Sequence, residues 1–288
     1  IKSSSPIKHI EFVDIRQSMM NGGGPACLRF KTVVNNDEFD KINEKFLLSS
    51  KKLMDLRALV SKHYRDQLNP EDLLDINLMH YYEPVLGEID IVFHLAAIAR
   101  IQPSFQKPQE YVDTNFQGTY EVVKYCIAKN IPLIYSGSSS IHSGRFKNPY
   151  TFSKDLGEDI IKLYQQHFQL EASVARFYNV YGPYQLTEGG YTTLIGRWLN
   201  NIKKGIQCEI YGDGYKKRDF SHVDDIVDGL IRIMKQQAYG HVFEFGRGKN
   251  HTINEVAAMF NIIPNYLEDK PGEAQETLAD YSNAASIL

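Results

Sequence analysis

The stretch P-L-I-Y-S-G-S-S-S, residues 132–140, decides the fold of this chain. It reads as a buried strand, expected over Pro132–Ser136, that ends in small hydroxyl residues. A helical pattern over Tyr150–Phe168 follows it, and then a second apolar run of strand length over Ala172–Phe177. Strand, helix and strand in this order are typical of a parallel sheet covered by helices, so the sequence predicts an α/β fold.

The same alternation extends in both directions from this stretch, beginning at about residue 88. Before it we expect a buried strand over Ile89–Leu95 and a helix over Glu110–Lys129. After it we expect helices over Thr192–Lys203, Val223–Met234 and Ile253–Phe260, and short strands over Gln207–Ile210 and His241–Phe245. Nearer the N-terminus the expected elements are strands over Ile7–Val13 and Leu28–Val34 and helices over Asp37–Leu48 and Lys51–Gln67.

Length, composition and charge narrow the class of protein. A chain of 288 residues with 43% hydrophobic and 23% charged residues is typical of a soluble globular protein with one large domain or two. The net charge of -3 gives no electrostatic reason to expect binding to nucleic acid or to an anionic membrane. The apolar runs are too short to span a bilayer. Three cysteines and no signal-peptide core predict a cytoplasmic location, and no metal site is predicted.

The stretch N-P-Y-T-F-S-K, Asn148–Lys154, carries the strongest chemical signal. Asn148 suits a helix cap and Pro149 the first helical position, which places Tyr150 and Lys154 four residues apart on one helical face. An ammonium about 4 Å from a phenol contributes roughly 4 kcal/mol at an effective dielectric near 20, enough to bring the tyrosine pKa toward neutrality. A positively charged nicotinamide would lower that pKa further. Such a tyrosine can accept a proton from an alcohol while hydride leaves the carbon.

Each of these signals also has an ordinary structural interpretation. Tyrosine and lysine at this spacing occur on many amphipathic helices, and a run of serines can be a plain turn. The serine run Ser136–Ser140 favours the chemical interpretation, because it ends a buried strand just before this helix. At the carboxyl end of a parallel sheet that arrangement puts an alcohol beside Tyr150.

A series of motifs then gives the chain a clear resemblance. In order along the chain they are V-F-H-L-A-A-I-A-R, V-D-T-N-F-Q-G-T, the serine run, P-Y-T-F-S-K, R-F-Y-N-V-Y-G-P, I-Y-G-D-G-Y-K-K-R-D-F-S-H-V-D-D-I and K-P-G-E-A-Q-E-T-L-A-D. From about residue 76 to the end, the chain resembles the extended short-chain dehydrogenases/reductases, specifically the NAD-dependent epimerase/dehydratase family acting on nucleotide sugars. The resemblance implies a partial NAD-binding Rossmann domain over residues 76–180. A small nucleotide-sugar substrate domain over residues 181–288 is interleaved with it.

The resemblance also implies a role for individual residues. The implied catalytic residues are Ser138, Tyr150 and Lys154. The residues implied to bind or line NAD are Ala96, Ala97, Asn115 and Phe177, together with Tyr150 and Lys154, which would hold the nicotinamide ribose. The residues implied to contact the substrate are Asn179, Arg218 and Lys270, the last standing where the family usually has arginine. The helices over Glu110–Lys129 and Tyr150–Phe168 are those through which family members often form homodimers.

Two details of the resemblance indicate the type of reaction. Family dehydratases carry Asp-Glu after the catalytic hydroxyl, whereas Ser139 and Ser140 follow Ser138 here. The stretch Gly189–Trp198 is similar to hexose and N-acetylhexosamine 4-epimerases. The implied reaction removes hydride from sugar C4 to NAD, lets the keto-sugar turn, and returns hydride to the other face. A decarboxylase or a reductase on the same scaffold is an open alternative.

One part of the family pattern does not occur in the sequence. The family begins with a strand, a G-x-x-G-x-x-G loop and a helix, and no stretch of the chain matches that loop. We therefore expect a Rossmann-like parallel sheet without its first strand, which is the strand that should pair with Ile89–Leu95. The strands over Ile7–Val13 or Leu28–Val34 are candidates to cover that edge. Because the loop holds the pyrophosphate, weak or no NAD binding is predicted.

The first 75 residues show a different resemblance. Two stretches, H-I-E-F-V-D-I-R-Q-S-M-M-N-G-G-G-P-A-C-L-R-F and H-Y-R-D-Q-L-N-P-E-D-L, are similar to the C-terminal part of N-succinylarginine dihydrolase, a pentein-fold guanidino hydrolase. Cys27 matches its nucleophile, but His9 and His63 do not match its partner histidine, which favours an unactivated strand cysteine. Two alternatives to the epimerase therefore stand: a fragment of this dihydrolase, and a non-catalytic remnant that binds a nucleotide sugar.

Overall fold

A four-stranded parallel sheet forms the centre of the protein. The computed structural model describes residues 89–288, and the order of the sheet there is β1-β2-β3-β8. Its strands are β1 (Val92–His94), β2 (Leu133–Ser138), β3 (Ala172–Phe177) and β8 (Val242–Phe245). All neighbouring pairs are parallel, which confirms the predicted α/β class.

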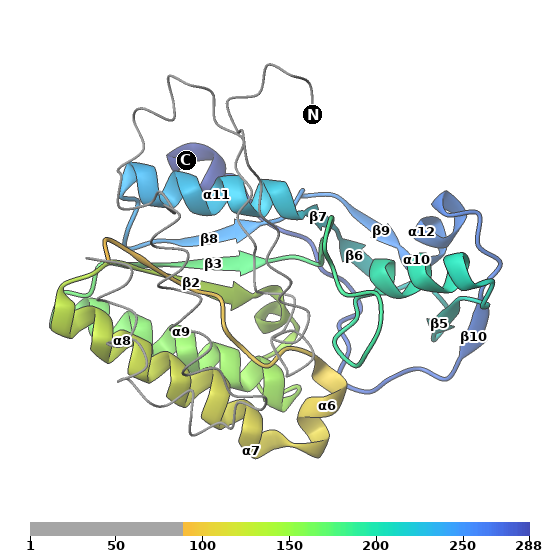
Figure 1. Cartoon of the computed structure of the whole chain (residues 1–288), viewed down its shortest axis with the longest axis horizontal. Helices are drawn as coiled ribbons and strands as arrows, with labels where there is room; N and C mark the ends of the chain where they lie inside the picture. The colour runs from red at the N-terminus through yellow and green to blue at the C-terminus, as the bar shows by residue number, and fades with distance from the viewer. Residues whose placement is uncertain (1–88) are drawn as a thin grey trace, which may run out of the picture.

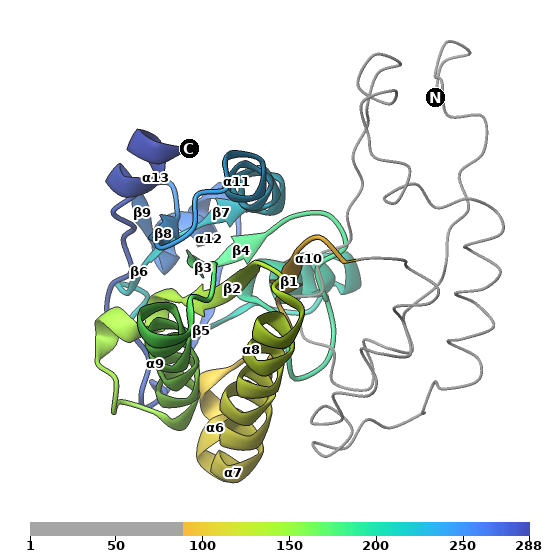
Figure 2. The same ribbon diagram turned by 90° about the vertical axis from the view of Figure 1, so that its left-hand side faces the viewer.

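Helices cover both faces of this sheet (Figures 1 and 2). On one face lie α6 (Ile101–Gln106), α7 (Pro108–Tyr111), the π-helical segment η2 (Val112–Gln117), α8 (Gly118–Lys129) and α9 (Pro149–Phe168). On the opposite face lie α11 (Val223–Gln236) and α13 (Ser282–Ile287). This three-layer arrangement is the Rossmann-like form that the sequence predicts.

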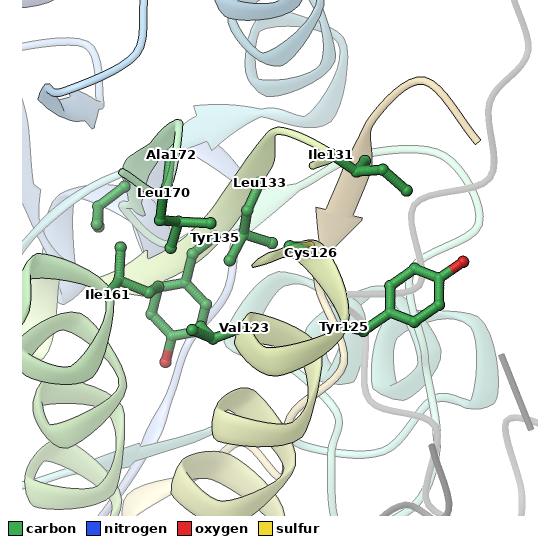
Figure 3. Packing of buried hydrophobic residues seen from close by; sticks show 10 residues of the cluster. Val123, Tyr125, Cys126, Ile131, Leu133, Tyr135, Ile161, Leu170 and Ala172 are labelled. Atoms are coloured by element: carbon green, nitrogen blue, oxygen red, sulfur yellow. The ribbon is translucent and has the colours of Figure 1, made fainter. Parts of the chain in front are cut away.

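The sheet is buried on both faces because its side chains alternate. In β2, Leu133 packs toward α8 and α9 with Val123 and Ile161, as Figure 3 shows. The next residue, Ile134, joins the opposite cluster with residues of α11. A strand covered on both faces reads as a continuous apolar run, which is why the run at 132–136 predicts this strand correctly.

A smaller unit follows the sheet in the chain and lies at one end of it (Figure 1). It contains α10 (Leu194–Lys204), α12 (Ile253–Met259) and three strand pairs. The pairs are β5 (Glu209–Tyr211) with β10 (Asn265–Leu267), β6 (Lys217–Asp219) with β9 (Asn250–Thr252), and β4 (Val180–Tyr181) with β7 (Ser221–His222). Trp198, Cys208 and Val256 form its core. Because α11 and β8 return to the main sheet, the two parts are interleaved in sequence.

Two differences from the expected elements have local causes. The helix expected over Glu110–Lys129 ends at Lys129 but begins at Pro108, and it passes through the π-helical turn η2. Helix α6 was not expected because Pro103 interrupts the pattern I-Q-P-S-F-Q. Pro103 falls in the first turn of α6, where a backbone N–H has no partner within the helix, so its missing donor costs little.

Some expectations concern residues 1–88 and lie outside the described residues. These are the absent first strand, the pairing of Ile7–Val13 or Leu28–Val34 with β1, the pentein-like segment, and the environment of Cys27. Within residues 89–288, β1 pairs with β2. None of the helices in that range is both long enough and apolar enough to cross a membrane.

Candidate active site

The candidate site lies where β2 and β3 end and α9 begins. Ser138, the last residue of β2, is paired in register with Phe177, the last residue of β3. Asn148 caps α9 by accepting a hydrogen bond from Thr151 N at 2.8 Å, with Pro149 following it, which confirms the expected helix start. Tyr150 thus stands in the first turn of α9, beside the carboxyl edge of the sheet, where α/β proteins bind their ligands.

Tyr150 and Ser138 meet as the sequence predicts. Tyr150 Oη donates a hydrogen bond to Ser138 Oγ at 3.3 Å. Ser138 Oγ also lies 2.9 Å from the hydroxyl of Ser140 and accepts from Ser140 N at 3.3 Å. The Tyr150 contact is longer than a typical O–H···O bond, as is common for catalytic groups before a substrate completes the geometry. The phenol and the alcohol can therefore contact one substrate oxygen together.

Lys154 lies one turn further along α9 but points to a different partner. Its side chain is 4% exposed, and Nζ lies 4.2 Å from the ring centroid of Tyr135 on β2. Burial lowers the pKa of Lys154 to about 7, while the charge of Glu158 acts in the opposite direction. The favourable cation–π contact with Tyr135 partly offsets this desolvation.

The expected effect of Lys154 on Tyr150 is corrected by this geometry. Burial raises the pKa of Tyr150 above its ordinary value, against the expected fall toward neutrality. The hydrogen bond with Ser138 and the positive charge of Arg100 oppose that rise. The expectation was wrong for two reasons. Removing a phenolate from water destabilises it more than these contacts stabilise it, and the Lys154 ammonium faces Tyr135.

The buried Lys154 predicts a specific pH dependence of stability. Between about pH 7 and the ordinary lysine pKa, the unfolded chain holds one proton more than the folded chain at this residue. The free energy of unfolding should therefore rise with pH across that window. Lys154→Met should remove this rise and stabilise the protein at neutral pH, as measured by urea unfolding at several pH values.

The matched control is Lys124→Met, which removes an exposed lysine that pairs with Glu121 on the surface of α8. This variant should keep the pH dependence of the natural chain. An unchanged slope in Lys154→Met would show that the ammonium is not desolvated in the folded protein.

Asn115 organises the loop that follows β1. Its Oδ1 accepts from Ile98 N at 2.7 Å, and its Nδ2 donates to Ile98 O at 3.0 Å and to Ser153 Oγ at 2.9 Å. Ala96 and Ala97 lie in the same loop, directly after β1. Asn115 comes from the π-helical turn η2, a feature that is frequent at functional sites. The loop expected to line a cofactor is thus held against the start of α9.

The three residues expected to contact the substrate lie in or beside the smaller unit. Asn179 Nδ2 donates to Asp219 O at 2.9 Å and to Thr277 Oγ1 at 3.0 Å. Arg218 is mostly buried, which lowers its pKa, and its Nη2 lies 3.8 Å from Glu273 Oε2. Lys270 Nζ lies 3.3 Å from the ring centroid of Tyr211. The structure thus places Arg218 and the 270–273 loop side by side, with Lys270 directed onto an aromatic ring.

Arg100 is a residue of this site that the sequence analysis missed. It follows the loop after β1, and its positive charge acts on Tyr150. The sequence does contain a signal for this site residue, because Arg100 is a single charged residue at the end of the apolar run I-V-F-H-L-A-A-I-A-R. Sequence alone could not distinguish it from a surface arginine.

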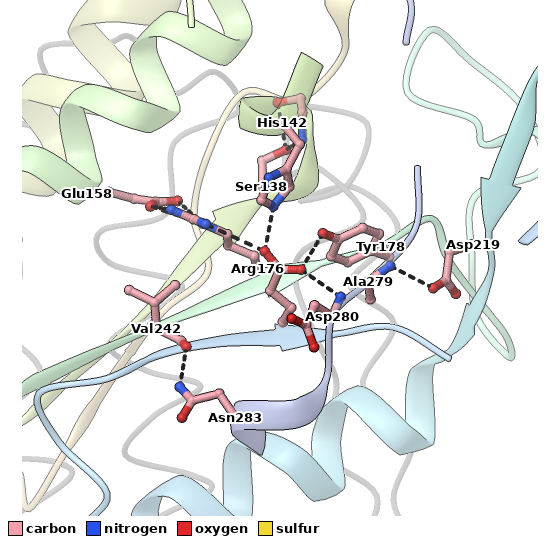
Figure 4. Close-up of polar contacts among 12 residues, drawn as sticks. Ser138, His142, Glu158, Arg176, Tyr178, Asp219, Val242, Ala279, Asp280 and Asn283 are labelled. Carbon is pink, nitrogen blue, oxygen red and sulfur yellow. Dashed lines mark hydrogen bonds and ion pairs between the residues drawn. The ribbon is translucent and has the colours of Figure 1, made fainter. Parts of the chain in front are cut away.

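A polar network beside the site ties β3 to its neighbours (Figure 4). Arg176 on β3 donates to both carboxylate oxygens of Glu158 on α9, and its Nη2 lies 2.6 Å from Glu158 Oε2. Glu244 on β8 accepts from Tyr178 Oη at 2.7 Å and from Asp280 N at 3.0 Å. These charged groups are satisfied by one another, so they fix the ends of the strands. Among residues 89–288 no cluster of His, Cys, Asp and Glu could hold a metal ion.

The parallel sheet, the tyrosine–serine pair at its carboxyl edge and the lysine one turn away define a Rossmann-like fold with a candidate ligand site at that edge. Comparison with known families narrows this class. The chain belongs to the NAD dependent epimerase/dehydratase family, whose sequence pattern matches residues 46–246. NAD is the cofactor of that family. The match begins within the segment that we predict to be dihydrolase-like, and the boundary at residue 75 stays a prediction.

Curated relatives include both epimerases and a decarboxylase. A UDP-glucuronate 4-epimerase from Thermodesulfobacterium geofontis is 30% identical over 220 residues, covering 69% of this chain and 67% of the relative. A UDP-N-acetyl-alpha-D-glucosaminuronate decarboxylase from Bacillus cytotoxicus is 27% identical over 205 residues, covering 65% of this chain and 62% of the relative. The chain thus spans about two thirds of the length of these relatives.

Solved structures agree with the fold. The UDP-N-acetylglucosamine 4-epimerase from Methanobrevibacter ruminantium, in complex with UDP-N-acetylmuramic acid, is 29% identical with a TM-score of 0.67 and covers 78% of this chain and 77% of its own. The UDP-glucuronic acid 4-epimerase from Bacillus cereus, in complex with UDP-glucuronic acid and NAD, is 26% identical with a TM-score of 0.67 and covers 82% and 79%.

The second resemblance is confirmed as well. The N-succinylarginine dihydrolase from Nitrosospira multiformis is 39% identical over 108 residues, which are 37% of this chain and 23% of the dihydrolase. The N-terminal part of the chain is therefore similar to a limited part of that enzyme.

Proposed function

We propose that the chain carries the catalytic part of a nucleotide-sugar 4-epimerase. The observation that carries this proposal is the hydrogen bond from Tyr150 Oη to Ser138 Oγ at 3.3 Å, at the carboxyl edge of a parallel sheet. In the proposed reaction Ser138 donates a hydrogen bond to the sugar C4 oxygen. Tyr150 Oη takes the proton from that oxygen and returns it after the keto-sugar has turned.

The chain's other site residues have supporting roles in this proposal. Bound NAD supplies the acceptor and donor of hydride. Lys154 holds the nicotinamide ribose, and Ala96, Ala97 and Phe177 line the cofactor, since all four stand at the carboxyl edge of the sheet or in the first turns of α9. Asn179, Arg218 and Lys270 hold the sugar diphosphate. Arg218 suits this role because a guanidinium can donate two parallel hydrogen bonds to a phosphate.

Relatives support a UDP-sugar as the substrate. The curated and solved relatives act on or bind UDP-glucuronate, UDP-N-acetylglucosamine and related sugars, as their names state. Turnover of a UDP-sugar to its C4 epimer, followed by chromatography, tests the proposal directly. Formation of carbon dioxide from a UDP-uronate in the same assay would favour the decarboxylase alternative. The similarity to the decarboxylase from Bacillus cytotoxicus supports that alternative.

We expect the affinity for NAD to limit this activity. The nicotinamide end fits the described residues, because Ser138, Tyr150 and the Asn115-held loop converge there. The pyrophosphate end lacks its usual sequence, because the 288 residues contain no G-x-x-G-x-x-G loop. We therefore expect the 288-residue chain to bind NAD more weakly than micromolar in calorimetry. A micromolar dissociation constant would show that another segment replaces the loop, and UDP binding in the same preparation serves as the control.

Two other functions are tested in the same preparation. The similarity to N-succinylarginine dihydrolase favours a guanidino-hydrolase fragment, for which ammonia release lost in Cys27→Ala is the test. A non-catalytic remnant would be stabilised thermally by UDP without turnover.

We also propose a homodimer through α8 and α9, which lie side by side in Figure 2.

A further inference from the structure

Arg100 sits in a strained and tightly fixed backbone next to the candidate base. Its φ of 93° is a conformation that residues with a side chain rarely adopt. The preceding residue is fixed, because Tyr111 Oη donates to Ala99 O at 2.8 Å. The ring of Tyr111 meets that of Tyr150 edge to face, with centroids 6.2 Å apart. Backbone strain of this kind persists where the surroundings impose it, and it is concentrated at ligand sites.

The guanidinium of Arg100 has unused hydrogen-bonding capacity. Its Nη2 donates to Tyr191 O at 2.6 Å, which joins the loop after β1 to the segment before α10. Its Nε is shielded from solvent and has no hydrogen-bond partner among residues 89–288. Leaving a buried donor on a charged group unpaired costs free energy, so this arginine is placed for an acceptor that the described part of the chain does not supply.

The charges around Arg100 are also unbalanced. Burial is the main cause that lowers the pKa of Arg100, and the nearby positive charge of Arg197 lowers it further. Glu273 opposes this effect, but that carboxylate also faces Arg218 and accepts from Gln102. Arg100 and Arg218 thus share the carboxylate of Glu273, and Arg197 adds a further positive charge near Arg100, which leaves net positive charge beside Tyr150. An anionic ligand group would balance it.

We infer that Arg100 binds a carboxylate carried by the sugar of the nucleotide-sugar ligand, so that the site prefers a uronate over a neutral hexose. The inference rests on the proposed function, which places the reacting sugar over Tyr150. A planar guanidinium matches a carboxylate with paired hydrogen bonds. The diphosphate is the alternative source of anionic oxygens, but Arg218 and the 270–273 loop in the smaller unit are placed for it.

The test compares three probes by calorimetry: UDP, UDP-glucose and UDP-glucuronate. We expect the natural chain to bind UDP-glucuronate about 10- to 100-fold more tightly than UDP-glucose, the range of a charge-assisted hydrogen bond. Arg100→Gln keeps an amide donor for Tyr191 O but loses the charge. It should abolish the preference and leave UDP affinity unchanged. Arg232→Gln, which removes an arginine paired with Asp228 on the surface of α11, should keep the preference.

Each other outcome has a defined meaning. Equal affinity of the natural chain for the two sugars overturns the inference without any variant, even if Arg100→Gln does not fold. An equal loss of UDP and UDP-sugar affinity in a folded Arg100→Gln overturns it in favour of a phosphate contact. If the chain prefers UDP-glucuronate to UDP-glucose but forms no C4 epimer, the proposed reaction is wrong and the inferred uronate site is supported. If UDP itself does not bind, both the proposed function and the inferred site are wrong.

Discussion

Replacement of Tyr150 by phenylalanine is expected to slow oxidation of the sugar at C4 by about 10²- to 10⁴-fold, the usual contribution of a positioned acid/base. The substitution removes one oxygen and keeps the ring that meets Tyr111 edge to face. Binding of the UDP-sugar should therefore change little, and the loss should appear in the rate at saturating substrate. The measurement is single-turnover absorbance of reduced nicotinamide, with NAD supplied in large excess because weak affinity is predicted.

The matched control is Tyr164→Phe. Tyr164 also lies on α9, but its hydroxyl contacts that of Tyr120 on α8, away from the sheet edge. This variant should retain the natural rate. If Tyr150→Phe were also to retain a rate within a few-fold of the natural chain, another group would have to remove the proton, and the proposed chemistry would be wrong.

The direction of the pKa shift adds a pH profile to this prediction. A general base acts as the deprotonated phenolate, and burial raises the pKa of Tyr150. Below that pKa the phenolate fraction grows about tenfold for each pH unit, so the rate of oxidation should rise with pH through the neutral range. A plateau near neutral pH would mean that bound NAD and Lys154 together outweigh the desolvation of the phenolate.

The second large effect concerns stability. Asp219→Ala is expected to reduce the free energy of unfolding by about 3–5 kcal/mol, the cost of breaking a buried charged contact from one side. The Asp219 carboxylate is fully buried and accepts from three backbone N–H groups: Arg247 N at 2.9 Å, Gly248 N at 2.9 Å and Ala279 N at 3.1 Å. Figure 4 shows the last of these contacts. One side chain thus joins β6 to the turn after β8 and to the C-terminal segment.

Urea unfolding followed by circular dichroism measures this effect. A loss of that size is a large part of the about 5–15 kcal/mol that stabilises a typical domain, so the Asp219→Ala chain should unfold at a much lower urea concentration than the natural chain. Asp219→Asn keeps one acceptor oxygen, so its free energy of unfolding should lie between those of the natural chain and of Asp219→Ala. Asp224→Ala, which removes an exposed carboxylate on α11, should unfold like the natural chain. A small effect of Asp219→Ala would show that water can replace the carboxylate.

Much of the fold could be predicted because its signals are local. The strand over Ala172–Phe177 is found as expected, because the apolar run that predicts it lies entirely within these six neighbouring residues. The start of α9 is set by Asn148 and Pro149, which act on the adjacent turn. Helices α6 and α13, the 3-10 turn η3 (Ser139–Ser143) and the short strands β4, β6, β7, β9 and β10 were missed. Those strands depend on partners distant in the chain, as β6 does on β9.

The sequence by itself determined the class of fold, the family, and the spacing of Tyr150 and Lys154 on α9, because periodicity, caps and motifs are written into neighbouring residues. Only the tertiary structure decided which groups those side chains face. Lys154 turns to Tyr135 of β2, and the cation acting on Tyr150 is Arg100 from the loop after β1. The physical reason is that the direction and desolvation of a buried charge depend on side chains brought in from other elements, and spacing along one helix carries no information about them.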